Sequence, residues 1–205
     1  PVHRTNITKT CGRCHGNTRK MNEFHLRQAH PVAPYERSVL GIALLQKKAA
    51  NAAVCTDCHG SHDLHRSTNT ASKLYFKNVP DTCGRCHGNE AIVGQGSAGR
   101  GNIVDLFRDS IHGKALIKSG LSVAPTCTDC HGSHDIRGKA DPASLVFRKT
   151  IPATCSRCHE GIGREYWEGV HGSQVAKGSP LAPVCTSCHT AHDIRRSDVE
   201  GWRLE

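Results

Sequence analysis

Apolar residues recur at helical spacing in three short stretches of this chain. The stretches are YERSVLGIAL at 35–44, FRDSIHGKAL at 107–116 and YWEGVHGSQV at 166–175. Residues three or four positions apart lie on one face of a helix, so each stretch predicts an amphipathic helix of modest length. We expect the second helix to end at Gly120, because glycine commonly follows the last helical residue. The rest of the sequence is typical of turns and loops, with little or no β-sheet.

The apolar runs are too short to predict a membrane span. The longest, SVLGIALLQKKAANAAV at 38–54, is interrupted by two lysines and predicts a short helix. A spanning helix needs about 18 or more apolar residues. No signal peptide is visible, and the chain opens with Pro1 rather than Met. We therefore expect a chain that has been processed or excised.

A repeated pair of motifs organises the whole sequence. All 12 cysteines fall into CxxC pairs that are followed directly by histidine. The six motifs alternate between an Arg type, starting at Cys11, Cys83 and Cys155, and a Thr type, starting at Cys55, Cys127 and Cys185. Their spacing of 72 residues predicts three copies of one unit, at 1–72, 73–144 and 145–205, the last one shortened by 14 residues.

The composition argues against an ordinary apolar core. Hydrophobic residues make up 37% of the chain and aromatic residues only 4%, while the chain holds 15 histidines. Disulfides, metals or a bulky cofactor must then replace the missing apolar mass. The net charge of +9 would suit an anionic partner, but the basic residues are scattered, with no run of five or six. This pattern argues against nucleic acid as a partner.

The CxxCH motif is the attachment signature of c-type haem. Two cysteines form thioethers with the porphyrin, and the adjacent histidine binds the iron as its proximal ligand. Zinc and disulfides are the alternatives, but neither requires a histidine after every second cysteine. Six motifs predict six haems c, and the basic residues are then expected to balance the haem propionates. The thioether cysteines are Cys11, Cys14, Cys55, Cys58, Cys83, Cys86, Cys127, Cys130, Cys155, Cys158, Cys185 and Cys188, and the proximal histidines are His15, His59, His87, His131, His159 and His189.

Enough further histidines exist to give most or all irons a second imidazole. The only methionine is Met21, so we expect mostly bis-histidine ligation and low reduction potentials. In each Thr-type motif a second histidine follows three residues after the proximal one, at His62, His134 and His192. Such a residue lies on the same side of the local turn as the proximal ligand. We therefore expect it to bind the iron of a neighbouring haem. The aspartate after each could orient an axial imidazole or cap a turn.

His112 and His171 occupy matching positions on the predicted helices and are the next distal candidates. In the first repeat Leu40 stands at that position. Either His25 or His30 (less favoured, His3 or His65) or another chain then supplies the missing ligand. Otherwise one haem stays five-coordinate.

The stretch SIHGKALIKSGLSVAPTCTDCHGSHDI at 110–136 resembles multihaem c-type cytochromes of metal- and sulfate-reducing prokaryotes. The resemblance implies short helices and coil packed around a chain of closely spaced haems, in one continuous unit of three dihaem repeats. It also implies a periplasmic carrier, an outer-surface conduit or a subunit of an extracellular cytochrome filament. The CxxCHxxH form is similar to that of the filament-forming cytochromes, where such a histidine can bind an adjacent haem.

Two functions fit these features. The first is electron transfer, with other redox proteins or extracellular electron acceptors as partners and a homopolymer as a further expectation. The second is an oxidoreductase with one open haem that reduces a small oxyanion such as nitrite, or a sulfur compound. We favour the carrier, with no catalytic residue, because the surplus histidines can cover every iron. Haem c is attached outside the cytoplasmic membrane, so we expect a periplasmic, cell-surface or extracellular protein.

Overall fold

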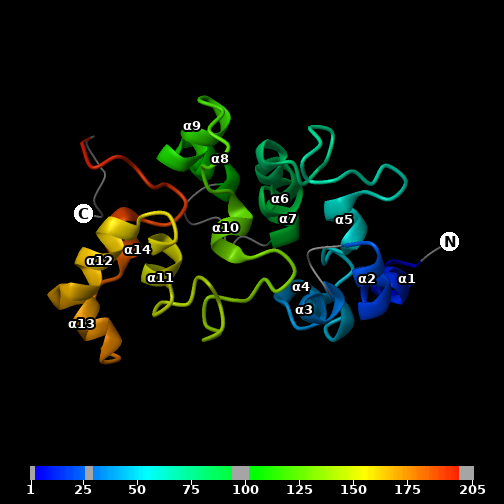
Figure 1. The fold of residues 1–205 in the computed structure, drawn as a ribbon, viewed down its shortest axis with the longest axis horizontal. Coiled ribbons are helices and arrows are strands. Elements are labelled where there is room, and N and C mark those ends of the chain that lie inside the picture. Colours follow the sequence, from blue (N-terminus) through cyan, green and yellow to red (C-terminus); the bar gives the residue numbers. More distant parts are fainter. Residues whose placement is uncertain (1–2, 26–29, 94–101, 199–205) are drawn as a thin grey trace. The chain divides into compact units, whose positions relative to one another are not determined.

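The regular elements of this chain are short helices joined by coil (Figure 1). The structure is a computed structural model, and it describes residues 3–25, 30–93 and 102–198. No strand occurs in these ranges, which confirms the predicted fold class of short α-helices and coil without sheet. Nor does any helix within them have the length and apolar character needed to cross a bilayer.

The helices follow the same order in the first two predicted repeats, and the third has fewer helices. The first repeat holds η1 (Arg4–Asn6), α1 (Ile7–His15), α2 (Thr18–Glu23), α3 (Val32–Glu36), α4 (Val39–Leu45) and α5 (Cys55–His59). The second holds η2 (Phe76–Asn78), α6 (Val79–His87), α7 (Glu90–Val93), α8 (Ile103–Asp109), α9 (Ile111–Ile117) and α10 (Cys127–His131). The third holds α11 (Ile151–Ser156), α12 (Glu160–Glu168), α13 (Val170–Ala176) and α14 (Cys185–His189).

The chain divides into two compact units whose boundary does not follow the repeats. The first unit comprises residues 1–82 and 132–136, and the second comprises 83–131 and 137–205. The short segment 132–136 therefore belongs with the first repeat, although it follows a motif of the second.

The three predicted amphipathic helices are each broken in two. The breaks fall at Ser38, Ser110 and Gly169, whose ψ angles of 164° to 172° are extended rather than helical. At the first break the Ser38 hydroxyl donates to the Tyr35 carbonyl (2.7 Å) and accepts from the Gly41 amide (3.1 Å). Serine in this position caps a new helix instead of continuing the old one. The prediction of single helices was wrong at this point, because the local cap outweighs the apolar periodicity.

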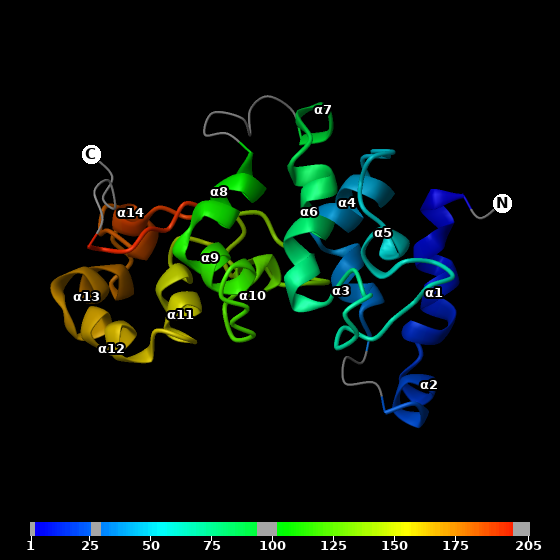
Figure 2. The ribbon, with the colours of Figure 1, turned by 90° about the horizontal axis from the view of Figure 1, so that it is seen from above.

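A glycine lets the two halves of each broken helix pack closely, as for α12 and α13 in Figures 1 and 2. At Gly41, Gly113 and Gly172 an added Cβ would clash with the carbonyl oxygen of the residue six positions earlier. Only a residue without a Cβ fits this approach.

Alanine at Gly113 should therefore destabilise the haem-loaded protein by about 1–3 kcal/mol, the usual cost of overpacking. Gly161 is the matched control, since an added Cβ there meets no atom within 4 Å. Alanine at Gly161 should be neutral or should stabilise α12 by up to about 1 kcal/mol. Thermal unfolding followed by circular dichroism, at equal haem content, measures both changes. Equal midpoints for the two variants would contradict the close packing.

Small apolar clusters join the helix pairs of the first and third repeats to the start of the next Thr-type motif. In the first repeat Tyr35, Leu44, Ala52 and Val54 form such a cluster, and the third repeat has an equivalent around Val175. The Tyr35 hydroxyl donates to the Ala53 carbonyl at 2.7 Å. These clusters fix the position of the CxxCH helix relative to the helix pair.

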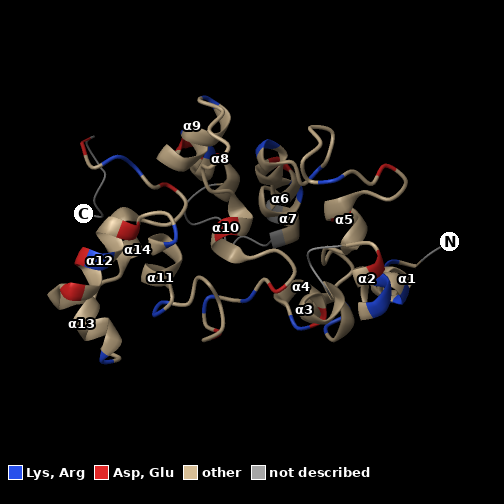
Figure 3. Ribbon diagram, in the orientation of Figure 1, with Lys and Arg blue, Asp and Glu red and all other residues tan. Residues whose placement is uncertain are grey.

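Charged side chains are spread along the elements without a basic stretch (Figure 3).

Candidate functional site

The CxxCH motifs lie in helices, as haem attachment requires. Five of the six are contained in helices that end at the proximal histidine, for example α1 at His15 and α5 at His59. In the remaining motif Cys155 lies in α11, and His159 precedes α12 as its N-cap. Cysteines three residues apart on a helix share one face, so both sulfurs can reach one porphyrin.

An aspartate inside the CTDCH motif holds the helix in place. The Asp57 carboxylate accepts the Val54 amide at 2.7 Å and pairs with Arg4 at 2.6 Å. Asp129 accepts the Thr126 amide at 2.7 Å in the same manner. A carboxylate at the first turn satisfies an otherwise unpaired N–H group and complements the helix dipole. The Arg4 contact also ties the chain before one motif to the start of the next.

The two attachment sites of each repeat are neighbours. The first cysteine of the Arg-type motif lies beside the first cysteine of the Thr-type motif in all three repeats and shifts the pKa of its thiol. The pairs are Cys11 with Cys55, Cys83 with Cys127, and Cys155 with Cys185. The two tethers of one repeat are therefore adjacent, which is the arrangement that a dihaem unit needs.

Three proximal histidines face an imidazole from another repeat. The ring centres are separated by 5.9–6.0 Å and the ring planes are parallel or moderately tilted. The pairs are His59 with His134 (6.0 Å, 10°), His131 with His192 (5.9 Å, 6°) and His112 with His159 (6.0 Å, 35°). In every pair one member belongs to a CxxCH motif and the other is a predicted distal ligand.

This separation fits an iron between the rings. Imidazole binds a metal at about 2 Å, and the ring nitrogen lies about 1 Å from the ring centre, so two axial imidazoles have centres roughly 6 Å apart. Rings stacked in direct contact would lie closer together. The histidines present therefore fit a bis-histidine haem at these three positions. The ligation itself stays a prediction.

Partial desolvation favours the form of most of these rings that binds metal. Desolvation lowers the pKa of five histidines of the pairs, namely His59, His112, His131, His134 and His192. A neighbouring imidazole lowers the pKa of each of them further, since the two rings cannot easily both be charged. Metal ligation requires the neutral imidazole, so the surroundings of the pairs favour the ligating form.

Backbone hydrogen bonds hold the helix pairs against the segments that carry His134 and His192. The Val39 amide at the start of α4 donates to the Ile136 carbonyl at 2.8 Å, and the Ile111 amide at the start of α9 donates to the Ile194 carbonyl at 2.8 Å. Both acceptors lie two residues after a distal histidine. Sequence reasoning missed these anchors. Two signals in the sequence were available. A serine precedes both α4 and α9, and an apolar residue follows the His-Asp pair in each repeat.

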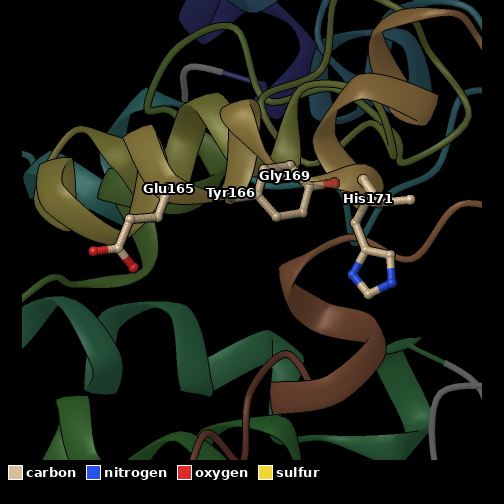
Figure 4. A pocket seen from close by; sticks show the side chains of 5 residues that line it. Glu165, Tyr166, Gly169 and His171 are labelled. Carbon is tan, nitrogen blue, oxygen red and sulfur yellow. The ribbon is translucent and has the colours of Figure 1, made fainter.

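Two predicted distal ligands lie outside the ring pairs. His62 is exposed, with its Nδ1 3.4 Å from the Ser61 hydroxyl. His171 is exposed on α13 at a cavity of about 240 Å³, where Figure 4 shows its imidazole projecting beyond Tyr166. The cavity is lined by Glu165, Tyr166, Gly169, Val170 and His171.

The candidates for the first repeat also lie outside the pairs. The His30 Nε2 is 3.0 Å from the Thr18 hydroxyl, and His25 is exposed. Their assignment as ligands stays a prediction.

The aspartates after the distal histidines are engaged locally. Asp63 accepts the Ser61 amide at 3.3 Å, as a turn cap does, and Asp135 pairs with Arg37 at 3.4 Å. Asp193 pairs with Arg195 through one oxygen, while its other oxygen, Oδ1, is buried and has no hydrogen-bond partner. That oxygen is placed to accept an additional N–H group.

Part of the chain matches a known protein family. Residues 121–163 match the family described as the doubled CXXCH motif. The matched stretch contains a Thr-type motif, the distal candidate His134 and the next Arg-type motif. The match indicates a multihaem c-type cytochrome that binds haem and transfers electrons. No curated protein and no solved structure matches the chain.

Proposed function

We propose that this chain carries electrons through six c-type haems, mostly bis-histidine ligated, in the periplasm or outside the cell. The observation that carries the proposal is the set of three imidazole pairs, with ring centres 5.9–6.0 Å apart. Each bound haem iron supplies one-electron chemistry by alternating between the ferrous and ferric states. The chain supplies the tethers, the axial ligands and the surroundings that keep those ligands neutral.

Ligation from two sides favours a carrier over an enzyme. An iron that holds an imidazole on each face has no position left for a substrate. A reductase needs an open iron with proton donors beside it. The rings of His59 and His134 instead face each other at 6.0 Å, and desolvation together with neighbouring imidazoles lowers the pKa of both. Bis-histidine ligation also favours low reduction potentials.

Ligands shared between repeats would also connect the redox centres. His134 follows the proximal ligand His131 by three residues and faces His59 of another motif. A short backbone segment would then link two haems directly. This favours rapid exchange of electrons with redox proteins or with extracellular acceptors, and it suits a chain that polymerises end to end.

A redox titration of the haem-loaded protein tests the proposal. We expect six haems per chain by mass and by pyridine haemochrome absorbance, and a titration that extends over several one-electron steps. Charges about 10 Å apart interact by roughly 1.7 kcal/mol at an effective dielectric of 20, so reduction of one haem shifts the potential of its neighbour. A single sharp one-electron curve, or fewer than six haems, would contradict the proposal.

A further inference from the structure

The residue directly after each Thr-type motif starts the short segment that leads to the next histidine. These residues are Gly60, Gly132 and Thr190. Their φ angles are positive, at 86°, 79° and 64° in the same order. Glycine adopts positive φ readily because it has no Cβ, whereas other residues do so at a cost. The third segment therefore carries a side chain where the backbone of the other two is occupied by glycine.

Thr190 is held in a conformation that threonine rarely adopts. Its φ of 64° and ψ of −169° are close to the 86° and −175° of Gly60. This region is populated almost only by glycine, and a residue branched at Cβ is the least suited to it. Such a residue costs free energy in the folded state, and that cost is relieved when the segment leaves its place.

The side chain of Thr190 also occupies the space of a turn bond. At Gly60 an added Cβ would lie 2.7 Å from Oδ1 of Asp63, the oxygen that accepts the Ser61 amide at 3.3 Å. In the third segment Oδ1 of Asp193 is buried and finds no hydrogen-bond partner among the described residues. The Thr190 hydroxyl donates instead to the Asp193 carbonyl at 2.7 Å. A buried carboxylate oxygen without a partner adds a second cost to this segment.

Both costs fall on the segment that carries His192. This histidine faces the proximal histidine His131, with ring centres 5.9 Å apart and ring planes 6° apart. Beyond His192 the Ile194 carbonyl accepts the Ile111 amide at 2.8 Å. All of these residues belong to the second compact unit. Movement of residues 190–194 away from this position would relieve the strain and withdraw the imidazole of His192 with them.

We propose that His192 is an exchangeable ligand, and that the haem tethered by Cys127 and Cys130 accepts a small neutral molecule such as carbon monoxide in its place. The proposal rests on the proposed haem ligation. In the exchange the bond between the iron and His192 breaks, the imidazole leaves in its neutral form, and the carbon atom binds the ferrous iron. No electron or proton is transferred. The apparent affinity depends on the fraction of chains in which His192 is withdrawn, and Thr190 raises that fraction.

Titration of the dithionite-reduced, haem-loaded protein with carbon monoxide, followed by Soret absorbance, tests the proposal. In Thr190→Gly one equivalent per chain should bind with roughly 5- to 150-fold lower affinity, because glycine accepts these backbone angles without strain. Thr190→Ala is the matched control. It keeps the Cβ and removes the hydroxyl and methyl groups, so the same equivalent should weaken far less. The reciprocal change Gly132→Thr places the strained side chain before His134 and should strengthen one equivalent at the haem of His59.

A second substitution shows whether Thr190 acts through His192 or through its own neighbour, the proximal ligand His189. His192→Ala removes the exchangeable ligand, so one equivalent should bind without competition. In that background Thr190→Gly should no longer change the affinity of any equivalent. Electron paramagnetic resonance of the oxidised protein should show one additional high-spin haem in His192→Ala and none in Thr190→Gly.

The outcomes distinguish this inference from the proposed function. No carbon monoxide binding by the starting protein, an unchanged affinity in Thr190→Gly, or the same shift with and without His192 overturns the inference while six haems and a multi-step titration remain. If His192→Ala does not load all its haems, the comparison of Thr190→Gly with Thr190→Ala provides the decision alone. A chain that carries fewer than six haems without any substitution overturns the proposed function itself.

Discussion

Replacement of His134 by alanine should convert one haem in six from low spin to high spin. His134 faces His59 at 6.0 Å with nearly parallel rings, and no methionine other than Met21 exists in the chain to take its place. Loss of an axial imidazole leaves a five-coordinate iron. Low-temperature electron paramagnetic resonance of the oxidised protein, with spins quantified against haem content, measures the change. The reduction potential of that haem should rise as well, because it loses a basic ligand.

His62 supplies the matched control. It occupies the same repeat position as His134 but is exposed and lies beside Ser61, outside the ring pairs of the described residues. His62→Ala should leave the spin states of the isolated chain unchanged. Equal spectra for the two variants would show that the ring pairs do not mark the ligands.

Removal of the haems should unfold the chain. The described residues include only 12 buried hydrophobic side chains, three of them alanine. Fully burying a large apolar side chain contributes about 1.5–3 kcal/mol, whereas ordering the backbone costs about 1–2 kcal/mol per residue. The small clusters around Tyr35 and Val175 cannot offset this cost without the apolar surface of the cofactor. A variant with all 12 cysteines replaced by alanine should lose its helical circular dichroism.

Small-angle scattering provides a second readout of the same variant. Its radius of gyration should increase from roughly 17 Å towards the roughly 50 Å of an unfolded chain of this length. A control that lacks only the Cys155 and Cys158 thiols should remain folded, with one haem and its two thioether bonds fewer. A compact, helical chain without any haem would contradict the expectation.

Local sequence patterns were sufficient to predict the fold class. The assignment of Cys55, Cys58 and His59 to one haem depends on the covalent spacing of the CxxCH motif and stays a prediction. The helices were predicted in the correct stretches but as single elements. Their division at Ser38 depends on a side chain that closes one helix turn and opens the next. The spacing of apolar residues along the sequence gives no information about such a cap.

The partners of the distal histidines could not be predicted. Sequence reasoning expected His134 to reach a neighbouring iron, but many neighbours were available. The choice depends on the hydrogen bond between Val39 and Ile136, which joins residues 97 positions apart. Such a contact is a product of tertiary packing.

The hydrogen bonds from α4 and α9 to the segments after His134 and His192 would couple local folding to the proposed electron transfer. With the proposed ligation, a repeat that opens locally would withdraw its imidazole from an iron tethered in another repeat, so the loss would extend beyond the part that opens. Heat or mild denaturant should interrupt the electron path well before the protein unfolds globally. The least stable of these contacts between repeats would then determine the temperature or denaturant concentration at which electron transfer along the whole chain stops.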